Sequence, residues 1–336
     1  LTYVVINMLA STMFLVAVGL IYSATGTVSM ADLVDKFDGL PEGTRIALGA
    51  LLLAVFAIKG AIFPFFFWLP DSSPTAPIAV SAVFAGLLTK VGIYTMIRAT
   101  TILDLDELQP VLLVAAGITM VIGVVGAIAQ DDIKRILSFH IISQVGYMLM
   151  GLAIYTVAGL AGAVLYVVHH IPVKTMLFLV SGLIEHTTGT AALHRLGGLI
   201  RRAPVIAVLF AVPALSLAGM PPFSGFLAKL SVVDAGLGAE RWAVVAAALV
   251  AGLLTLFSMS KIWAGAFWGT ADDPPPALAD PDGPALRPPR LMVWSTAAML
   301  VVTLVVPVFA MAVFDLAERA AEQLLDRQQY VEAVFE

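Results

Sequence analysis

Hydrophobic runs of about 20 residues alternate with short polar segments along almost the whole chain. An α-helix needs about 20 apolar residues to cross the hydrocarbon core of a membrane. By this measure the pattern predicts an all-α polytopic membrane protein with about nine transmembrane helices. The expected spans are residues 3–24, 45–68, 77–99, 110–130, 134–155, 158–185, 204–234, 242–268 and 291–314.

The polar segments between the spans differ from one another. Residues 25–44 form an acidic, polar loop, and the proline-rich segment 269–290 is expected to be an exposed, non-helical linker. The tail from Asp315 mixes apolar and charged residues, which is typical of an amphipathic helix lying on the membrane surface.

Lysine and arginine are distributed unequally between alternate loops, and this predicts the orientation. The side richer in them carries Lys134, Arg135, Arg195, Arg201, Arg202, Arg287 and Arg290. The other side carries Lys36, Arg45, Arg98 and Arg241, with Arg319 and Arg327 in the tail. Cytoplasmic loops are enriched in Lys and Arg, so the first side is predicted to be cytoplasmic.

Composition supports the membrane assignment, since 60% of the residues are hydrophobic and 12% charged. A typical soluble domain has about 45–50% apolar and about 25% charged residues. The chain has no cysteine, and its net charge of −5 includes no basic stretch of the kind that binds nucleic acid. An apolar run begins at Leu1 with no basic segment before it, so we expect an internal span of an N-terminally truncated chain rather than a signal peptide.

The basic residues are divided by type. Lys59, Lys90, Lys174 and Lys229 lie within or near the middle of apolar runs, whereas the arginines lie at run ends and in loops. A desolvated lysine can lose its proton, and an arginine effectively cannot. The pattern therefore indicates proton handling inside the membrane.

Prolines interrupt two of the predicted spans beside these lysines. Lys59 precedes Pro64, and Lys229 follows Pro221 and Pro222. Helix breaks at membrane depth occur against protein or a water-filled cavity, and paired broken helices mark the transport path in inverted-repeat transporters. The alternative at the first break is a packing kink with a lysine that reaches the membrane surface.

Further titratable residues lie between the two breaks. His140 follows Asp131 and Asp132, either of which could cap its helix, and His170 and Lys174 share a helix face at a spacing of four. These residues predict a proton relay. For His169, on another face, a hydrogen bond to a neighbouring helix is the preferred interpretation.

The spans contain no carboxylate; Glu185 and Asp234 come closest and fall at span ends. Four charged, unpaired lysines would be costly, so some are expected to be neutral or to have partners outside this chain. Lys134 and Lys261, near helix ends, are explained more simply by snorkelling, although a relay role for Lys134 stays open. No metal site, phosphate loop or nucleophile triad is visible, so no cofactor and no metal are predicted.

Five motifs between about residues 50 and 235 resemble the antiporter-like subunits shared by Mrp-type cation/proton antiporters and respiratory complex I. They are KGAIFPFFFWLPDSSPTAP, LLTKVGIY, QDDIKRILSFHIISQVGYMLMG, HHIPVKTMLFLVSGLIEHTTGT and LAGMPPFSGFLAKL. The amino-acid sequences of these motifs are most similar to those of the D-type subunits of Mrp antiporters. The resemblance implies helices six to fourteen of a fourteen-helix fold built from two inverted five-helix repeats.

The resemblance also implies roles for particular residues. Lys59 matches the lysine of broken helix seven, Lys90 the basic residue of helix eight, His170 and Lys174 those of helix eleven, and Lys229 that of helix twelve. Tyr166 stands where the family has a further histidine. The family's helix-five glutamate, which pairs with the helix-seven lysine, has no counterpart in this chain.

The implied organisation has three parts. Residues 1–105 would complete the first repeat, 106–268 would form the second, and 269–336 would hold the proline-rich loop, the last transmembrane helix and the tail. The first hypothesis is a proton-translocating subunit of an Na⁺ or K⁺/H⁺ antiporter in the bacterial inner membrane, without enzymatic activity. Its partners would be the other subunits of the complex, and protons would move along Lys59, Lys90, His140, His170, Lys174 and Lys229.

Two alternatives stay open. An antiporter-like subunit of complex I or a related membrane-bound hydrogenase would have the same fold and relay, with redox chemistry supplying the energy. A non-transporting scaffold would tolerate leucine in place of the buried lysines.

Overall fold

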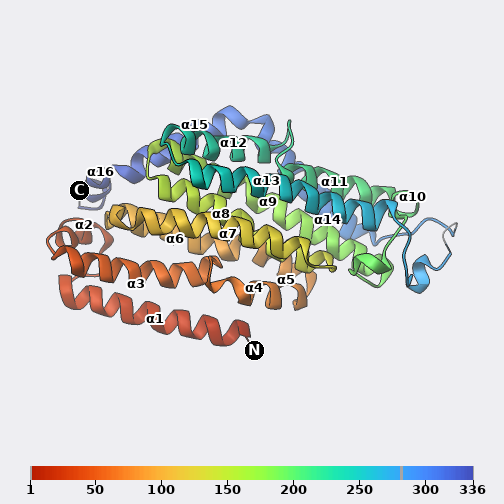
Figure 1. Ribbon diagram of the computed structural model, residues 1–336, viewed down its shortest axis with the longest axis horizontal. Helices are drawn as coiled ribbons and strands as arrows, with labels where there is room; N and C mark the ends of the chain where they lie inside the picture. Colours follow the sequence, from red (N-terminus) through yellow and green to blue (C-terminus); the bar gives the residue numbers. More distant parts are fainter. Residues whose placement is uncertain (1, 281–282, 336) are drawn as a thin grey trace.

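The computed structural model describes residues 2–280 and 283–335, whose helices run side by side in an elongated bundle (Figure 1). Eight described helices are long and apolar enough to cross a membrane, which confirms the all-α membrane fold. The α-helices are α1 Thr2–Thr25, α2 Met30–Asp38, α3 Glu42–Gly60, α4 Trp68–Ser72, α5 Ile78–Val83, α6 Thr89–Ile102, α7 Gln109–Ile128, α8 Ile133–Ile154, α9 Val157–Thr188, α10 Leu199–Arg202, α11 Pro204–Ala218, α12 Ser224–Gly238, α13 Trp242–Ile262, α14 Arg290–Val308, α15 Ala310–Leu325 and α16 Arg327–Phe335.

Helix α8 forms the centre of the bundle, and nearly all of its residues are buried. Glycines let its backbone approach both sequence neighbours closely. A Cβ on Gly123 of α7 would lie 2.4 Å from the Ser143 nitrogen, and a Cβ on Gly151 of α8 would lie 2.6 Å from the Gly159 oxygen of α9. Small residues at such crossings give membrane helices the van der Waals contact that holds them together. Polar side chains on α8 are thereby shielded from the surrounding lipid.

The span predicted at 204–234 is two half-helices, α11 and α12, as its prolines indicate. Helix α11 ends at Ala218, four residues before Pro222, because a proline ring clashes with the carbonyl four positions earlier. Each half-helix has 15 residues, too few for an isolated span. The two half-helix ends, Ala218 and Ser224, are buried, whereas Met220, Pro221 and Pro222 between them are exposed.

The polar segments are more ordered than the sequence pattern indicates. The 25–44 segment, expected to be a loop, contains the amphipathic helix α2, which buries Leu33, Val34 and Phe37. The described part of 269–290 has only a short 3₁₀ turn at Pro276–Leu278, and residues 281–282 lie outside the described residues. In the tail, α15 packs against α9 and buries Ala317 and Ala321, which lie on one helix face.

The two ends of the bundle carry different elements, as Figure 1 shows. Helices α2 and α16 lie together at one end, where Arg327 pairs with Asp38 at 3.0 Å and with Asp104 at 3.3 Å. Helix α10 lies at the opposite end, where Arg202 donates to the backbone oxygens of Ala277 and Pro284 in the proline-rich segment.

Candidate proton-relay site

Lys59 lies in the last turn of α3, directly before the first helix break. Pro64 has no backbone N–H, and its ring excludes a helical carbonyl four residues earlier, so α3 ends at Gly60. Ala61 follows in a left-handed conformation with φ of 56°. The proline thus ends the helix at the residue after the lysine.

The Lys59 side chain is half-buried and donates a hydrogen bond of 2.8 Å to Asn7 Oδ1 on α1. The carbonyl of Ile58 at the same break accepts a hydrogen bond of 2.9 Å from the indole N–H of Trp68. The lysine therefore interacts with a neighbouring helix, while the backbone at its own break has a separate donor.

Lys90 follows a π-helical turn over Phe84–Leu88 and is buried. Its amine donates to the Ala85 carbonyl at 2.7 Å and to Thr89 Oγ1 at 3.2 Å. A π turn displaces backbone carbonyls from the regular helical pattern, and such turns occur frequently at functional sites. The oxygens that the Lys90 amine contacts come from the turn and from the residue directly before the lysine.

The centre of the bundle holds His140 on α8 with His170 and Lys174 on α9, all fully buried. His140 Nε2 and Ser258 Oγ share a hydrogen bond of 2.8 Å, and the Lys174 amine donates to the Leu137 carbonyl at 3.1 Å. Within the described residues, neither ring nitrogen of His170 has a hydrogen-bond partner. His170 and Lys174 therefore do not form a direct hydrogen bond in the described part of the chain.

Lys229 lies on α12 and reaches back across the second break. Its amine donates to the carbonyls of Leu217 at 3.0 Å and Ala218 at 2.9 Å, which are the last residues of α11. It also lies 5.4 Å from the ring centroid of Tyr147 on α8. The carbonyl oxygens at a helix C-terminus carry partial negative charge, so this position stabilises the ammonium form.

His169 has the structural contact that was expected of it. Its Nδ1 and Ser224 Oγ share a hydrogen bond of 2.8 Å, which joins α9 to the first residue of α12. Tyr166, on the same helix, donates its hydroxyl to Gln144 and stacks on Tyr147 with ring centroids 5.2 Å apart. Both residues tie α9 to its neighbours.

The helices that carry the predicted relay pack against one another. A Cβ on Gly86, in the π-helical turn before Lys90, would lie 2.4 Å from Thr175 Oγ1 on α9, next to Lys174. Lys59 lies on α3, which packs against α6.

The contact between α3 and α6 depends on a glycine. A Cβ on Gly92, two residues after Lys90, would lie 2.5 Å from the Gly60 nitrogen, next to Lys59. The structure thus places Lys59 and Lys90 on two helices whose backbones are in close contact.

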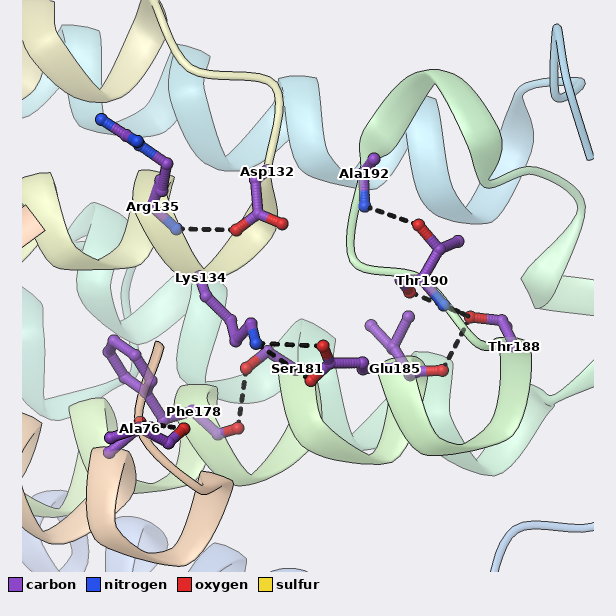
Figure 2. Close-up of polar contacts among 12 residues, drawn as sticks. Ala76, Asp132, Lys134, Arg135, Phe178, Ser181, Glu185, Thr188, Thr190 and Ala192 are labelled. Atoms are coloured by element: carbon purple, nitrogen blue, oxygen red, sulfur yellow. Dashed lines mark hydrogen bonds and ion pairs between the residues drawn. The ribbon is translucent and has the colours of Figure 1, made fainter. Parts of the chain in front are cut away.

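An ion pair lies at one end of the same two central helices, as Figure 2 shows. The Lys134 amine on α8 lies 3.0 and 3.1 Å from the two carboxylate oxygens of Glu185 on α9. Snorkelling was the simpler expectation for Lys134, but the side chain pairs within the protein. The Lys261 amine likewise donates to the carbonyls of Ile128 and Gln130 at the end of α7.

Sequence reasoning missed the hydrogen-bond partners of the candidate relay residues. Asn7, Ser258 and Ser224 are uncharged residues within apolar helices, and each contacts a lysine or histidine singled out above. A lone amide in an apolar span is a usable signal for Asn7. Serines are common in membrane helices, so Ser258 and Ser224 carried no comparable signal. Asp132, in contrast, accepts from the Arg135 N–H and caps α8 as expected.

Residues 1–255 match the family model described as "NADH:quinone oxidoreductase/Mrp antiporter, TM". The chain belongs to this family. A relative in this family, the D-type subunit of an Na⁺/H⁺ antiporter of Alkalihalophilus pseudofirmus, is 44% identical over 339 aligned residues, which cover 100% of this chain and 67% of the relative.

Solved structures agree with the family assignment. The Mrp complex from a Dietzia species contains a chain with a TM-score of 0.90 and 36% identity, and the match covers 100% of this chain and 69% of that one. A chain of the membrane-bound sulfane sulfur reductase, an archaeal respiratory membrane complex, gives a TM-score of 0.89 at 25% identity over 98% of this chain and 66% of that one. The antiporter-like family thus includes both antiporter and respiratory assemblies.

Proposed function

We propose that this chain is a proton-translocating membrane subunit of a multisubunit monovalent cation/proton antiporter. The observation that carries the proposal is the group of buried lysines and histidines at the bundle centre, whose contacts are carbonyls and hydroxyls rather than carboxylates. An amine held in this way can exist neutral or charged, since no fixed negative charge locks it in the ammonium form.

Protons enter at Lys59 and pass to Lys90, cross the bundle by His140, His170 and Lys174, and leave by Lys229. Lys90, His140, His170 and Lys174 are buried on α6, α8 and α9, whereas Lys59 is half-buried and contacts Asn7 of α1. Alternating protonation of the lysines couples this flux to Na⁺ or K⁺ movement elsewhere in the complex. The relative named as an Na⁺/H⁺ antiporter subunit supports the cation-coupled version.

The remaining assignments extend the same proposal. Residues 1–105 and 106–268 belong to two inverted repeats, and 269–336 forms a C-terminal extension. The complex resides in the bacterial inner membrane, with the end that carries Lys134, Arg135 and α10 facing the cytoplasm. The other subunits of the complex are its partners.

A redox-driven complex is the second candidate, favoured by the similarity to the archaeal respiratory membrane complex. The relay would be unchanged, and only the energy source would differ. An imposed Na⁺ or K⁺ gradient separates the two, since it drives proton flux in an antiporter without any electron donor.

The test uses the complete complex in proteoliposomes with a pH-sensitive dye. We expect Lys229→Ala and Lys59→Ala each to abolish proton flux driven by a cation gradient, while Lys36→Ala, in the exposed part of α2, keeps it. Normal exchange in both relay variants would refute the proposal and favour the scaffold hypothesis.

A further inference from the structure

The ion pair between Lys134 and Glu185 is exposed unequally. The Lys134 side chain is 13% exposed and the Glu185 side chain 42% exposed, so the carboxylate meets the surrounding water and the amine lies behind it. Among the ion pairs of the part of the chain that the structure describes, this is the one that joins the two helices carrying His140, His170 and Lys174. The pair thus connects the surface to the central helices.

Polar residues continue from this pair along one face of α9. Glu185, Ser181 and Lys174 are separated by four and seven positions, spacings that return to the same side of a helix. Ser181 is buried, and its hydroxyl donates to the Phe178 carbonyl at 2.7 Å, which leaves its lone pairs free to accept (Figure 2). From Glu185 to Lys174 the rise along α9 is about 16 Å, or roughly three turns.

The Lys174 side chain shortens the distance between the ion pair and the relay. Its amine reaches the Leu137 carbonyl of α8, which lies three positions along α8 from Lys134. Both lysine amines therefore border the same contact between α8 and α9. Water molecules on either side of the Ser181 hydroxyl would complete the path between them.

We propose that Lys134 and Glu185 form the proton-exchange terminal of the relay on the predicted cytoplasmic side. The inference rests on the function proposed above and adds two residues to it. Glu185 takes a proton from bulk water, and Lys134 delivers one to Lys174 by way of Ser181.

The step conserves protons and charge. The Lys134 ammonium releases one proton through water and the Ser181 hydroxyl to the neutral Lys174 amine. The protonated Glu185 carboxyl then returns a proton to the Lys134 amine, and the ion pair forms again. Movement in the opposite direction reverses each transfer.

Other charged groups near the pair are engaged elsewhere. Asp132 accepts from the Arg135 backbone N–H at 3.0 Å, and the Arg135 guanidinium lies 3.9 Å from Asp71 on α4. Asp131 pairs with His194, and His186 is on the last turn of α9. Within the described residues, none of them contacts Lys134 or Glu185.

Lys134→Arg provides the decisive test. Arginine keeps the ion pair and the helix contact but does not release a proton. We expect cation-driven proton flux in proteoliposomes to fall by about tenfold, less than the roughly hundredfold or larger effect typical of a general acid–base group, while the amount of assembled complex stays normal. Glu185→Gln should also slow the flux and weaken its dependence on the pH of the compartment facing α10, and Glu185→Asp should restore part of it.

Arg135→Lys is the matched control, since it alters the neighbouring cation without touching the pair, and its flux should equal that of the unmodified complex. Normal flux and an unchanged pH profile in Lys134→Arg would show that the pair is only a structural tie. Lys229→Ala in the same series separates the two proposals. If Lys229→Ala loses flux and Lys134→Arg does not, the terminal is wrong and the relay stands; if both carry normal flux, the proposed function itself fails.

Discussion

The two helix breaks differ in where the lysine lies and in what its amine contacts. In the first, Lys59 lies on the half-helix before the break and turns to Asn7 of another helix. In the second, Lys229 lies on the half-helix after the break and turns back to the carbonyls that end α11. The ammonium of Lys229 is therefore stabilised by the break itself, whereas that of Lys59 depends on whichever helix packs beside it. The protonation of Lys229 should accordingly be coupled to the shape of its break.

The largest expected loss of proton flux follows from replacing Lys59 or Lys229 with arginine, which stays charged. Lys229→Arg retains a cation at the α11 terminus and Lys59→Arg retains a donor to Asn7, yet neither side chain can release a proton. Each variant should lose proton flux by about a hundredfold, the scale of a missing proton-transfer group. Flux assays on complexes with normal subunit content test this, and substantial flux in either variant would mean that the residue acts only through its charge.

Alanine at the same two positions should destabilise the protein by different amounts. Lys229→Ala removes the donor from two backbone carbonyls and should cost about 1–3 kcal/mol, the range for an unsatisfied buried acceptor. Lys59→Ala leaves only a side-chain amide without its partner and should cost less than about 1 kcal/mol. Thermal unfolding of the purified complex checks the order, and equal losses would contradict the proposed difference.

Close backbone contacts at the two breaks predict that alanine in place of glycine destabilises the complex, by an amount that depends on the space available. A Cβ on Gly225 would lie 1.7 Å from the Ser216 carbonyl oxygen, whereas a Cβ on Gly92 would lie 2.5 Å from the Gly60 nitrogen. Gly225→Ala should therefore destabilise the complex more than Gly92→Ala, with both near the roughly 1–3 kcal/mol typical of overpacking. Gly238→Ala, which meets nothing within 4 Å, is the matched control and should leave the melting temperature unchanged.

The smallest effects should come from the uncharged partners. Asn7→Leu removes the acceptor of Lys59 and should reduce flux severalfold, and Tyr147→Phe keeps the ring near Lys229 and should change flux very little. Tyr147→Phe loses the hydroxyl bond to the Ala248 carbonyl, worth about 1 kcal/mol of stability. Thr12→Ala, at an exposed position on α1, is the control for Asn7→Leu. A larger loss of flux in Tyr147→Phe than in Asn7→Leu would contradict the expected ranking of the two contacts.

Much of the fold could be predicted because its signals are local. The apolar runs have the length of the membrane core, and α3 and α11 end four residues before Pro64 and Pro222, where the proline ring disfavours a helical carbonyl. Helix α2 is harder to predict because its charges hide a short apolar face that is buried only against other helices. Its amphipathic pattern over nine residues is too short to stand out from a polar segment.

The candidate site could be predicted only in part. The lysines and histidines stood out because ionisable residues are rare within membrane spans. Their contacts did not, since Asn7 and Lys59 are 52 positions apart and Lys134 and Glu185 are 51 apart. Such pairs depend on how each helix is rotated and how far it slides along its neighbour.

The amino-acid sequence alone was enough to predict a helical membrane protein that resembles the antiporter-like family, with proline-broken helices and lysines inside apolar spans. Span length, proline geometry and the chemistry of lysine are properties of short segments, so they can be read without a fold. The packed bundle was needed to show that Lys229 donates to a carbonyl at the end of α11, that Lys59 donates to Asn7 of α1, and that Glu185 pairs with Lys134. Those outcomes depend on which helix faces meet, and residues far apart in the chain jointly set that arrangement.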